Sequence, residues 1–198
     1  LEGNETGLVA YYNFDERVGD VIYDISENNN TATFEGNITR LNFLADGLNF
    51  SPNPDFVTTT YDASTAIDGS SILSVGAWIK TSADGAIFSQ IPTGGQYNYM
   101  FTVSGGALRI GINPNGGTWN WHSTTKLVND DQWHYVSTSK SGSSIKIYID
   151  GNLELNTTTT SIIGTKASAE PFVIGDVANN TETPYHFDGN IAEVTLWN

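Results

Sequence analysis

The sequence predicts an all-β protein, a two-sheet antiparallel β-sandwich, and three observations support this fold class. Short apolar runs are separated by turn-forming residues at intervals of roughly 8–12 residues, the spacing of sandwich strands. Ile145, Ile147 and Ile149 alternate with Lys146 and Tyr148, as they do in a strand with one buried face. No segment repeats its apolar residues with the period of a helix.

The stretch Gln132–Leu155 is predicted to form three consecutive antiparallel strands. Alternation along the first strand places Trp133, Tyr135 and Ser137 on one of its faces. The pair Asp150-Gly151 separates the second and third strands, and such a pair favours a two-residue hairpin turn because both positions need a positive φ. A meander of hairpins is therefore expected at the centre of the fold.

The other strands are predicted from alternation and from the turn residues between them. Residues 97–103 and 107–113 form a hairpin through Ser104-Gly105-Gly106, and residues 114–121 follow as a glycine-rich loop. Further strands are expected at 7–14, around Thr33, at 48–50, 56–57, 71–81, 85–90, 172–175 and 189–198.

Apolar residues on the strand faces are the predicted core. Large aromatic side chains bury roughly 150–250 Å² each and dominate such cores, so three tryptophans are assigned to the interior with the aliphatic residues. The set is Trp78, Trp133, Trp197, Ile145, Ile147, Ile149, Val194 and Leu196.

The length of 198 residues fits a single domain, which we place over residues 1–198. Cysteine is absent, so disulfides contribute nothing to stability. The chain begins without a methionine and ends at the close of a predicted strand, and we therefore expect it to be one module of a longer protein, joined to other domains.

The chain is acidic because basic residues are few. It has 8 Lys and Arg against 22 Asp and Glu, a net charge of −14. Such a surface repels nucleic acid and anionic membranes and suits neutral ligands or divalent cations. No apolar run reaches the length of a membrane span, so direct membrane insertion is not expected.

Three segments in order resemble the laminin-G-like family of concanavalin A-like jelly rolls. The central one is Trp133-His134 followed by the meander with Asp150-Gly151. The others are GLVAYYNFDE at 7–16, followed by Asp24-x-Ser26-x-Asn28, and FDGNIAEVTLWN at 187–198. The resemblance implies a concanavalin A-like jelly roll over nearly the whole chain.

The chain contains six Asn-x-Ser/Thr sequons, which are acceptors for glycans only in a secreted protein. Together they favour an extracellular or cell-surface location. Their asparagines are Asn4, Asn29, Asn37, Asn49, Asn156 and Asn179.

Catalysis is not predicted. Sandwich glycoside hydrolases need two carboxylates facing the scissile bond, and in the jelly-roll enzymes these come from one Glu-x-Asp-x-Glu strand that this sequence lacks. His122, His134 and His186 are widely spaced and do not form a zinc pattern. His134 is interpreted as a structural histidine with local hydrogen bonds.

A calcium site is the first candidate. The segment 24–30 places oxygen-bearing side chains at every second position, and Ca²⁺ takes six to eight oxygens. The resemblance implies calcium in many relatives, and the best-matching positions are Asp15, Asp24, Asn28 and Asp188. Ala192 stands where related hydrolases carry a calcium-binding Asp. The alternative is that Asp24 and Asn28 cap turns through their own backbone.

A glycan site is the second candidate, near the hairpin 97–113 and the loop after it. Alternation puts Trp119 and Trp121 on the same side, where their rings could line a groove or pack into the structure. We expect at least one of them to be exposed beside Tyr97 or Tyr99. The full predicted set is Tyr97, Asn98, Tyr99, Trp119, Asn120, Trp121 and His122.

The leading functional hypothesis is a non-catalytic carbohydrate-binding or adhesion module of a secreted or surface protein. Its partner would be a glycan, a surface glycoprotein or a polysaccharide, with calcium as an optional cofactor. The alternative is a structural or protein-interaction module without a glycan ligand, and a glycoside hydrolase is a remote third.

Overall fold

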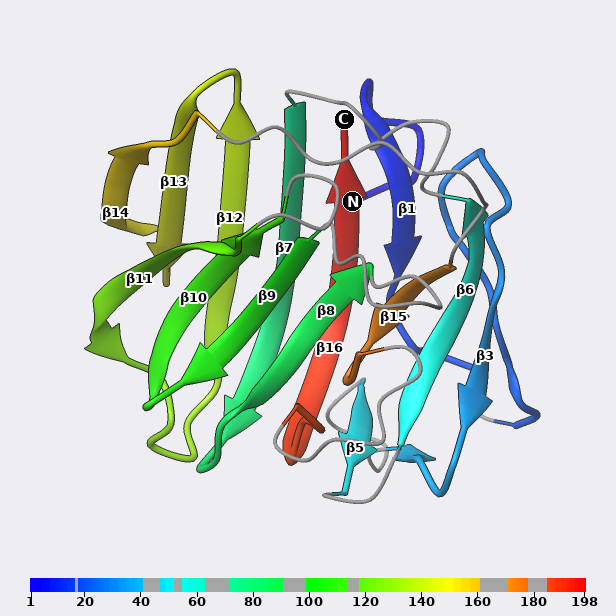
Figure 1. Cartoon of the computed structure of the whole chain (residues 1–198). Coiled ribbons are helices and arrows are strands. Elements are labelled where there is room, and N and C mark those ends of the chain that lie inside the picture. The colour runs from blue at the N-terminus through cyan, green and yellow to red at the C-terminus, as the bar shows by residue number, and fades with distance from the viewer. Residues whose placement is uncertain are drawn as a thin grey trace.

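The computed structural model is a sandwich of two antiparallel β-sheets, one behind the other in Figure 1. It describes residues 1–16, 18–40, 47–51, 55–62, 72–90, 99–113, 118–160, 171–177 and 185–198. Within these ranges no residue is helical, which confirms the predicted all-β class. None of the described elements is therefore a helix that could cross a membrane.

The rear sheet in Figure 1, which we call sheet A, has eight strands and contains the predicted meander. All the pairings between its strands are antiparallel. Its order is β14 (Asn152–Thr158), β13 (Ser144–Ile149), β12 (His134–Ser141), β7 (Ile72–Thr81), β16 (Gly189–Trp197), β5 (Leu48–Phe50) and β4 (Thr39–Arg40), with β1 (Leu8–Tyr12) also pairing with β16.

The front sheet, sheet B, also has eight strands. It contains the predicted hairpin of residues 97–113, observed as β9 and β10. Its order is β11 (Asn120–Leu127), β10 (Ala107–Ile112), β9 (Tyr99–Ser104), β8 (Gly85–Gln90), β15 (Pro171–Ile174), β6 (Phe56–Asp62), β3 (Ala32–Glu35) and β2 (Val21–Ile22).

A single large core fills the space between the sheets. The alternating isoleucines of β13 are fully buried there, and so are Val194 and Leu196 of β16, as predicted. Sheet B contributes Phe88, Phe101 and Phe172, whose rings stack on one another at centroid distances of 5.6–5.7 Å. The inner faces of both sheets are thus committed to stability, and a ligand site must be sought on the outer faces or the rims.

The two predicted hairpin turns form for the expected reason. Asp150 and Gly151 have φ of 53° and 78°, and Gly105 and Gly106 have φ of 60° and 78°. These values lie in the left-handed region, which glycine enters without a steric penalty and aspartate tolerates. The turns therefore set the register of β13 against β14 and of β9 against β10.

Two predictions are corrected. The segment Asn120–Leu127 is a strand that pairs with β10. Its first two residues were predicted to belong to the loop 114–121, and no strand was predicted for the rest. The assignment of three tryptophans to the core is also wrong. Trp78 is 38% exposed, and Trp133 and Trp197 are only partly buried. Trp78 and Trp197 lie on the outer face of sheet A, where the alternation of β7 and β16 places them opposite the core residues.

Candidate ligand-binding site

The outer face of sheet A carries small hydroxyl residues in rows that cross its central strands. In one row Thr195 of β16 pairs with Gly76 of β7, and Gly76 pairs with Ser137 of β12. In the next row Trp197 pairs with Ser74, which pairs with Ser139. Residues opposite one another in an antiparallel pair share a face, so each row presents its side chains together.

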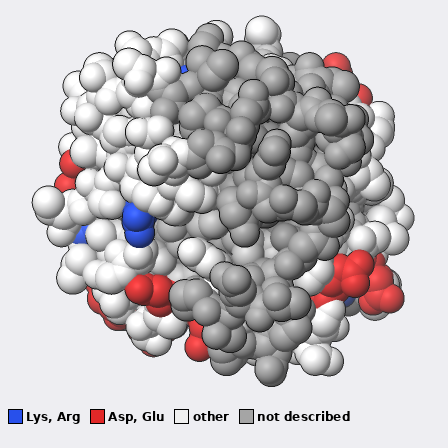
Figure 2. Space-filling model, in the orientation of Figure 1, with Lys and Arg blue, Asp and Glu red and all other residues white. Residues whose placement is uncertain are grey.

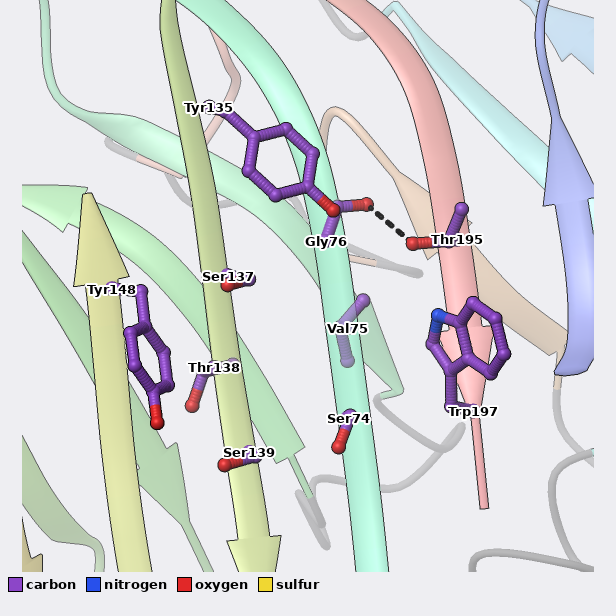
Figure 3. Close-up of a pocket in the computed structure, with 10 residues that line it drawn as sticks. All are labelled: Ser74, Val75, Gly76, Tyr135, Ser137, Thr138, Ser139, Tyr148, Thr195 and Trp197. Atoms are coloured by element: carbon purple, nitrogen blue, oxygen red, sulfur yellow. Dashed lines mark hydrogen bonds between the residues drawn. The ribbon is translucent and has the colours of Figure 1, made fainter. Parts of the chain in front are cut away.

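These rows form the floor of an open groove of about 390 Å³ on sheet A. Figure 3 shows Tyr148 at one end, Trp197 at the other, and serine side chains on the strands between them. The two rings come from β13 and β16, which are three strand spacings apart, or roughly 14 Å at about 4.8 Å per spacing. The groove is lined by Ser74, Val75, Gly76, Tyr135, Ser137, Thr138, Ser139, Tyr148, Thr195 and Trp197.

Tyr135 forms a third aromatic wall because β7 has a glycine beneath it. A Cβ at Gly76 would lie 2.5 Å from the Tyr135 hydroxyl oxygen and 3.1 Å from Oγ1 of Thr195. The tyrosine can therefore lie across β7, with its hydroxyl over the strand (Figure 3). On the other side of Tyr135, the ring of Trp78 makes an edge contact at a centroid distance of 5.5 Å.

The groove combines flat apolar rings with hydroxyls and has no charged residue in its lining. Rings with one open face can stack on the apolar face of a sugar, and hydroxyls both donate and accept hydrogen bonds. A site of this kind suits an uncharged, hydroxyl-rich ligand. This groove was not predicted from the sequence. The available signal was the alternation of strand 71–81, which puts Trp78 on the face opposite Val75, Ala77 and Ile79 and therefore away from the core.

The predicted tryptophan pair lies on the outer face of sheet B. Trp119 and Trp121 share a side and stack at a centroid distance of 4.8 Å, and both are partly buried. The guanidinium carbon of Arg109 lies 3.8 Å from the centroid of the Trp121 ring. Two groups at such distances do not fit on one face of a ring, so both faces of Trp121 are already covered.

The other residues of the predicted glycan set do not gather around this pair. Tyr99 is 1% exposed and points into the core, where burial raises the pKa of its phenol, so it cannot contact a ligand. Asn120 and His122 pair with Ile112 and Ile110, on the face opposite Trp121. Burial lowers the pKa of His122. Tyr97 and Asn98 lie outside the described residues.

Both carboxylate oxygens of Asp24, from the predicted calcium set, accept hydrogen bonds from nearby backbone amides and from one serine hydroxyl. One carboxylate oxygen accepts the amides of Tyr11 and Ser26, both at 2.9 Å. The other accepts the Ser26 hydroxyl and the Asn30 amide, both at 2.8 Å. Asn28 turns its amide nitrogen to the carbonyls of Leu8 and Val9. The bond from the Ser26 amide is the local turn cap that the alternative predicts for Asp24. Asn28 does not cap its own turn in this way, because its side chain bonds carbonyls of the distant strand β1.

The remaining two predicted calcium ligands lie elsewhere. Asp15 is exposed and accepts a 2.6 Å bond from Asn13. Asp188 is exposed and precedes β16, whereas β1, to which Asp24 is bonded, pairs with the far half of β16. Within the described ranges, no group of three His, Cys, Asp or Glu side chains could hold a metal.

His134 has the predicted structural role. Its Nδ1 lies 2.9 Å from Asp150 and its Nε2 lies 3.1 Å from Asp130. The Asp150 carboxylate also accepts the amide of Tyr135 at 3.1 Å. The histidine thus links the start of β12 to the turn between β13 and β14.

Comparison with known proteins gives a family and a set of similar folds. A laminin-G-type model described as the concanavalin A-like lectin/glucanases superfamily matches residues 53–198. No curated protein sequence matches the chain. The similar solved structures below share only 12% identity with it, so they speak to the fold alone.

Three of these structures are botulinum neurotoxin proteins. One, with a TM-score of 0.76, is described with the finding that cell entry of type C toxin depends on two ganglioside molecules. The others are binding domains of type DC in complex with rat synaptotagmin II and with SialylT, with TM-scores of 0.74 and 0.71. Each match covers 96% of this chain and 47–48% of the other, so the chain spans about half the length of these proteins.

Proposed function

The chain belongs to the concanavalin A-like lectin/glucanases superfamily, and from that premise we propose that it is a non-catalytic carbohydrate-binding module whose ligand lies in the groove on sheet A. The observation that carries the proposal is the lining of that groove: Tyr135, Tyr148 and Trp197 stand around a floor of hydroxyls without any charged side chain. Ligand sites commonly combine apolar walls with a few polar anchors in this way.

The location of the groove supports the same proposal. It lies on the strands at the centre of sheet A, whose backbone is fixed by pairing on both sides and whose inner face is packed into the core. Side chains on such strands are held in place before a ligand arrives, which lowers the entropy cost of binding. A neutral glycan is the ligand class that this wall and this floor fit.

The proposal assigns the groove a binding role and no hydrolytic one. Glycoside hydrolysis needs a pair of carboxylates across the scissile bond, and no Asp or Glu is among the residues that line it. The neurotoxin proteins of similar fold, of which the match covers about half, are reported with a ganglioside requirement and in a complex with SialylT, which supports a glycan as the ligand class to test. A surface glycan would place the module at the cell exterior.

The test is a glycan array with the wild-type chain and the variants Trp197→Ala and Tyr148→Ala. Removing a central aromatic contact at an interface costs about 2 kcal/mol or more, which is roughly thirtyfold in affinity. The matched control is Tyr23→Ala, since Tyr23 is a 61% exposed aromatic outside the groove. Equal binding by all variants, or binding to no glycan, would favour the protein-interaction alternative.

We propose calcium as a cofactor separately from the groove. It needs its own test, because both oxygens of Asp24 already accept hydrogen bonds within the protein. A ligand that binds only the folded state at a hundredfold excess over its Kd adds about 2.7 kcal/mol to stability. The melting temperature in millimolar Ca²⁺ should then exceed that in chelator. If the two melting curves coincide while Asp24→Asn lowers both equally, the aspartate only caps its turn.

A further inference from the structure

A second, smaller pocket lies on the outer face of sheet B, on the other side of the sandwich from the groove. It holds about 150 Å³, less than the roughly 300–1,000 Å³ of pockets for drug-sized molecules. Its space therefore suits one small ligand. The lining residues are Asp84, Thr102, Val103, Ser104, Arg109, Trp121 and Tyr185.

Arg109 is held rigidly at this pocket. Its guanidinium stacks over Trp121, whose ring in turn lies over Gly111, where a Cβ would come within 2.5 Å of the ring. Trp119 stacks on Trp121 and completes the ladder. A planar guanidinium fixed by an indole loses little entropy when it forms further hydrogen bonds.

The hydrogen-bonding capacity of Arg109 is largely unused. A guanidinium has five N–H donors, and here one of them makes a 3.4 Å bond to the Ser104 hydroxyl. Lys80 and Lys126 pair with aspartates at 3.8 and 3.5 Å, but Arg109 has no carboxylate within ion-pair distance among the described residues. That is unexpected in a chain with 22 acidic and 8 basic residues. Among the coloured residues in Figure 2, a small blue patch lies over β10.

Asp84 supplies the complementary chemistry. Its two carboxylate oxygens accept the amides of Gly105 and Gly106 at 2.6 and 2.9 Å, which fixes the side chain at the pocket edge. Each oxygen retains further acceptor capacity, which a ligand hydroxyl can use. The pocket thus presents a fixed donor fork, a fixed acceptor and the aromatic side chain of Tyr185.

We propose that this pocket binds a small hydroxylated carboxylate of the sugar-acid class, such as a hexuronate. The carboxylate would accept paired hydrogen bonds from Arg109, the geometry for which a guanidinium is suited. The sugar hydroxyls would donate to Asp84. The proposal is independent of the neutral-glycan groove, because the two sites share no residue and lie on opposite outer faces.

The test is a calorimetric or NMR titration of the full chain with glucuronate and galacturonate, set against glucose and galactose. Each neutral sugar differs from its acid only at the carboxylate, so it is the matched control ligand. We expect saturable binding of at least one acid. Its neutral parent should bind at least about tenfold more weakly, because hydrogen bonds to a charged group are worth about 1.5–3 kcal/mol.

Three variants locate the interaction. Arg109→Gln should abolish acid binding, Arg109→Lys should retain a weaker form of it, and Tyr23→Ala, at an exposed aromatic outside both sites, should leave it unchanged. Melting temperatures report whether each variant is folded. The proposal fails if neither acid binds at millimolar concentration, if Arg109→Gln weakens the binding of the neutral parents as much as that of the acids, or if folded Arg109→Gln binds the acids as the wild type does. Each of these results can occur whether or not the groove binds a glycan.

Discussion

The two outer faces of the sandwich both carry partly buried aromatic side chains, but the rings are arranged differently on each face. On sheet A, Tyr148 and Trp197 stand apart with serines between them and line an open groove. On sheet B, Trp119 and Trp121 stack on each other and Trp121 also carries Arg109. An aromatic on a strand is available to a ligand only if its cross-strand neighbours leave a ring face uncovered.

The neighbours that decide this are small residues. Gly111 of β10 leaves room for the Trp121 ring to extend from β11 over β10. There the ring contacts Arg109, which is also on β10. Gly76 similarly lets Tyr135 lie across sheet A, but the next positions are Ser74 and Ser139, whose short side chains leave the floor open. The first arrangement fills its space with protein, and the second leaves it for a ligand.

The largest expected effect separates the roles of two tryptophans. Trp121→Ala removes the centre of a stacked ladder and should lower the free energy of unfolding by about 2 kcal/mol, below the roughly 3–5 kcal/mol of a fully buried ring. Trp197→Ala, at the groove, should cost less than about 1 kcal/mol while removing glycan binding. Denaturant unfolding measures both values. Equal losses of stability would remove the distinction between the faces.

A second pair of variants adds a methyl group beneath each face. Gly111→Ala forces a Cβ against three atoms of the clamped Trp121 ring at 2.5–2.7 Å and should destabilise the fold by about 1–3 kcal/mol. Gly76→Ala mainly meets the terminal hydroxyl of Tyr135, which is free to swing away on an open face. Calorimetric melting should therefore show a clear drop for the first variant.

The consequence for Gly76→Ala lies in binding. A displaced Tyr135 alters the groove wall, so glycan affinity should fall several-fold while the melting temperature stays near that of the wild type. Gly142→Ala in the exposed turn between β12 and β13 tests general backbone sensitivity, although its φ of 55° adds strain of its own. If Gly76→Ala binds normally, Tyr135 takes no part in recognition.

Much of the fold follows from the sequence because strand alternation and turn chemistry are local. The Asp150-Gly151 turn and the isoleucines of β13 behave as predicted. The groove was not predicted, because tryptophan was assigned to the core by size although Trp78 stands opposite three aliphatic residues of its strand. On β16, the pairing register with β7 shifts between Ala192 and Thr195, where Glu193 has a φ of 49°. This irregularity changes which side chains face the core, and the residue types do not reveal its position.

The predicted glycan set illustrates the same limit. Alternation correctly placed Trp119 and Trp121 on one side, but their mutual stacking and the contact with Arg109 depend on the pairing of β10 with β11. That strand was not predicted, so its partner residues were not known. The arrival of Asp84 and Arg109 at one pocket, from positions far apart in the chain, has no local signal at all.

The smallest expected effect concerns two histidine–aspartate pairs with opposite pH responses. Burial raises the pKa of the Asp150 carboxyl, but the hydrogen bond and charge of His134 outweigh it and leave that pKa lowered. Burial dominates at Asp176, 2.7 Å from His186, and raises its pKa. Asp150 therefore adds stability above its unfolded-state pKa of about 3.9, and this is lost as pH falls. Asp176 adds stability below that pKa, and this is lost as pH rises through its folded value.

Unfolding free energies of wild type, Asp150→Asn and Asp176→Asn between pH 3 and pH 7 test these signs. The advantage of the wild type over Asp150→Asn should shrink as the pH falls, and should be modest throughout because the pair is solvent-screened. The difference in unfolding free energy between the wild type and Asp176→Asn should instead shift in favour of the wild type as the pH falls. The reason is that burial disfavours the ionised form of the Asp176 carboxyl. Parallel slopes for both variants would mean that the two aspartates are in equivalent surroundings, contrary to their burial.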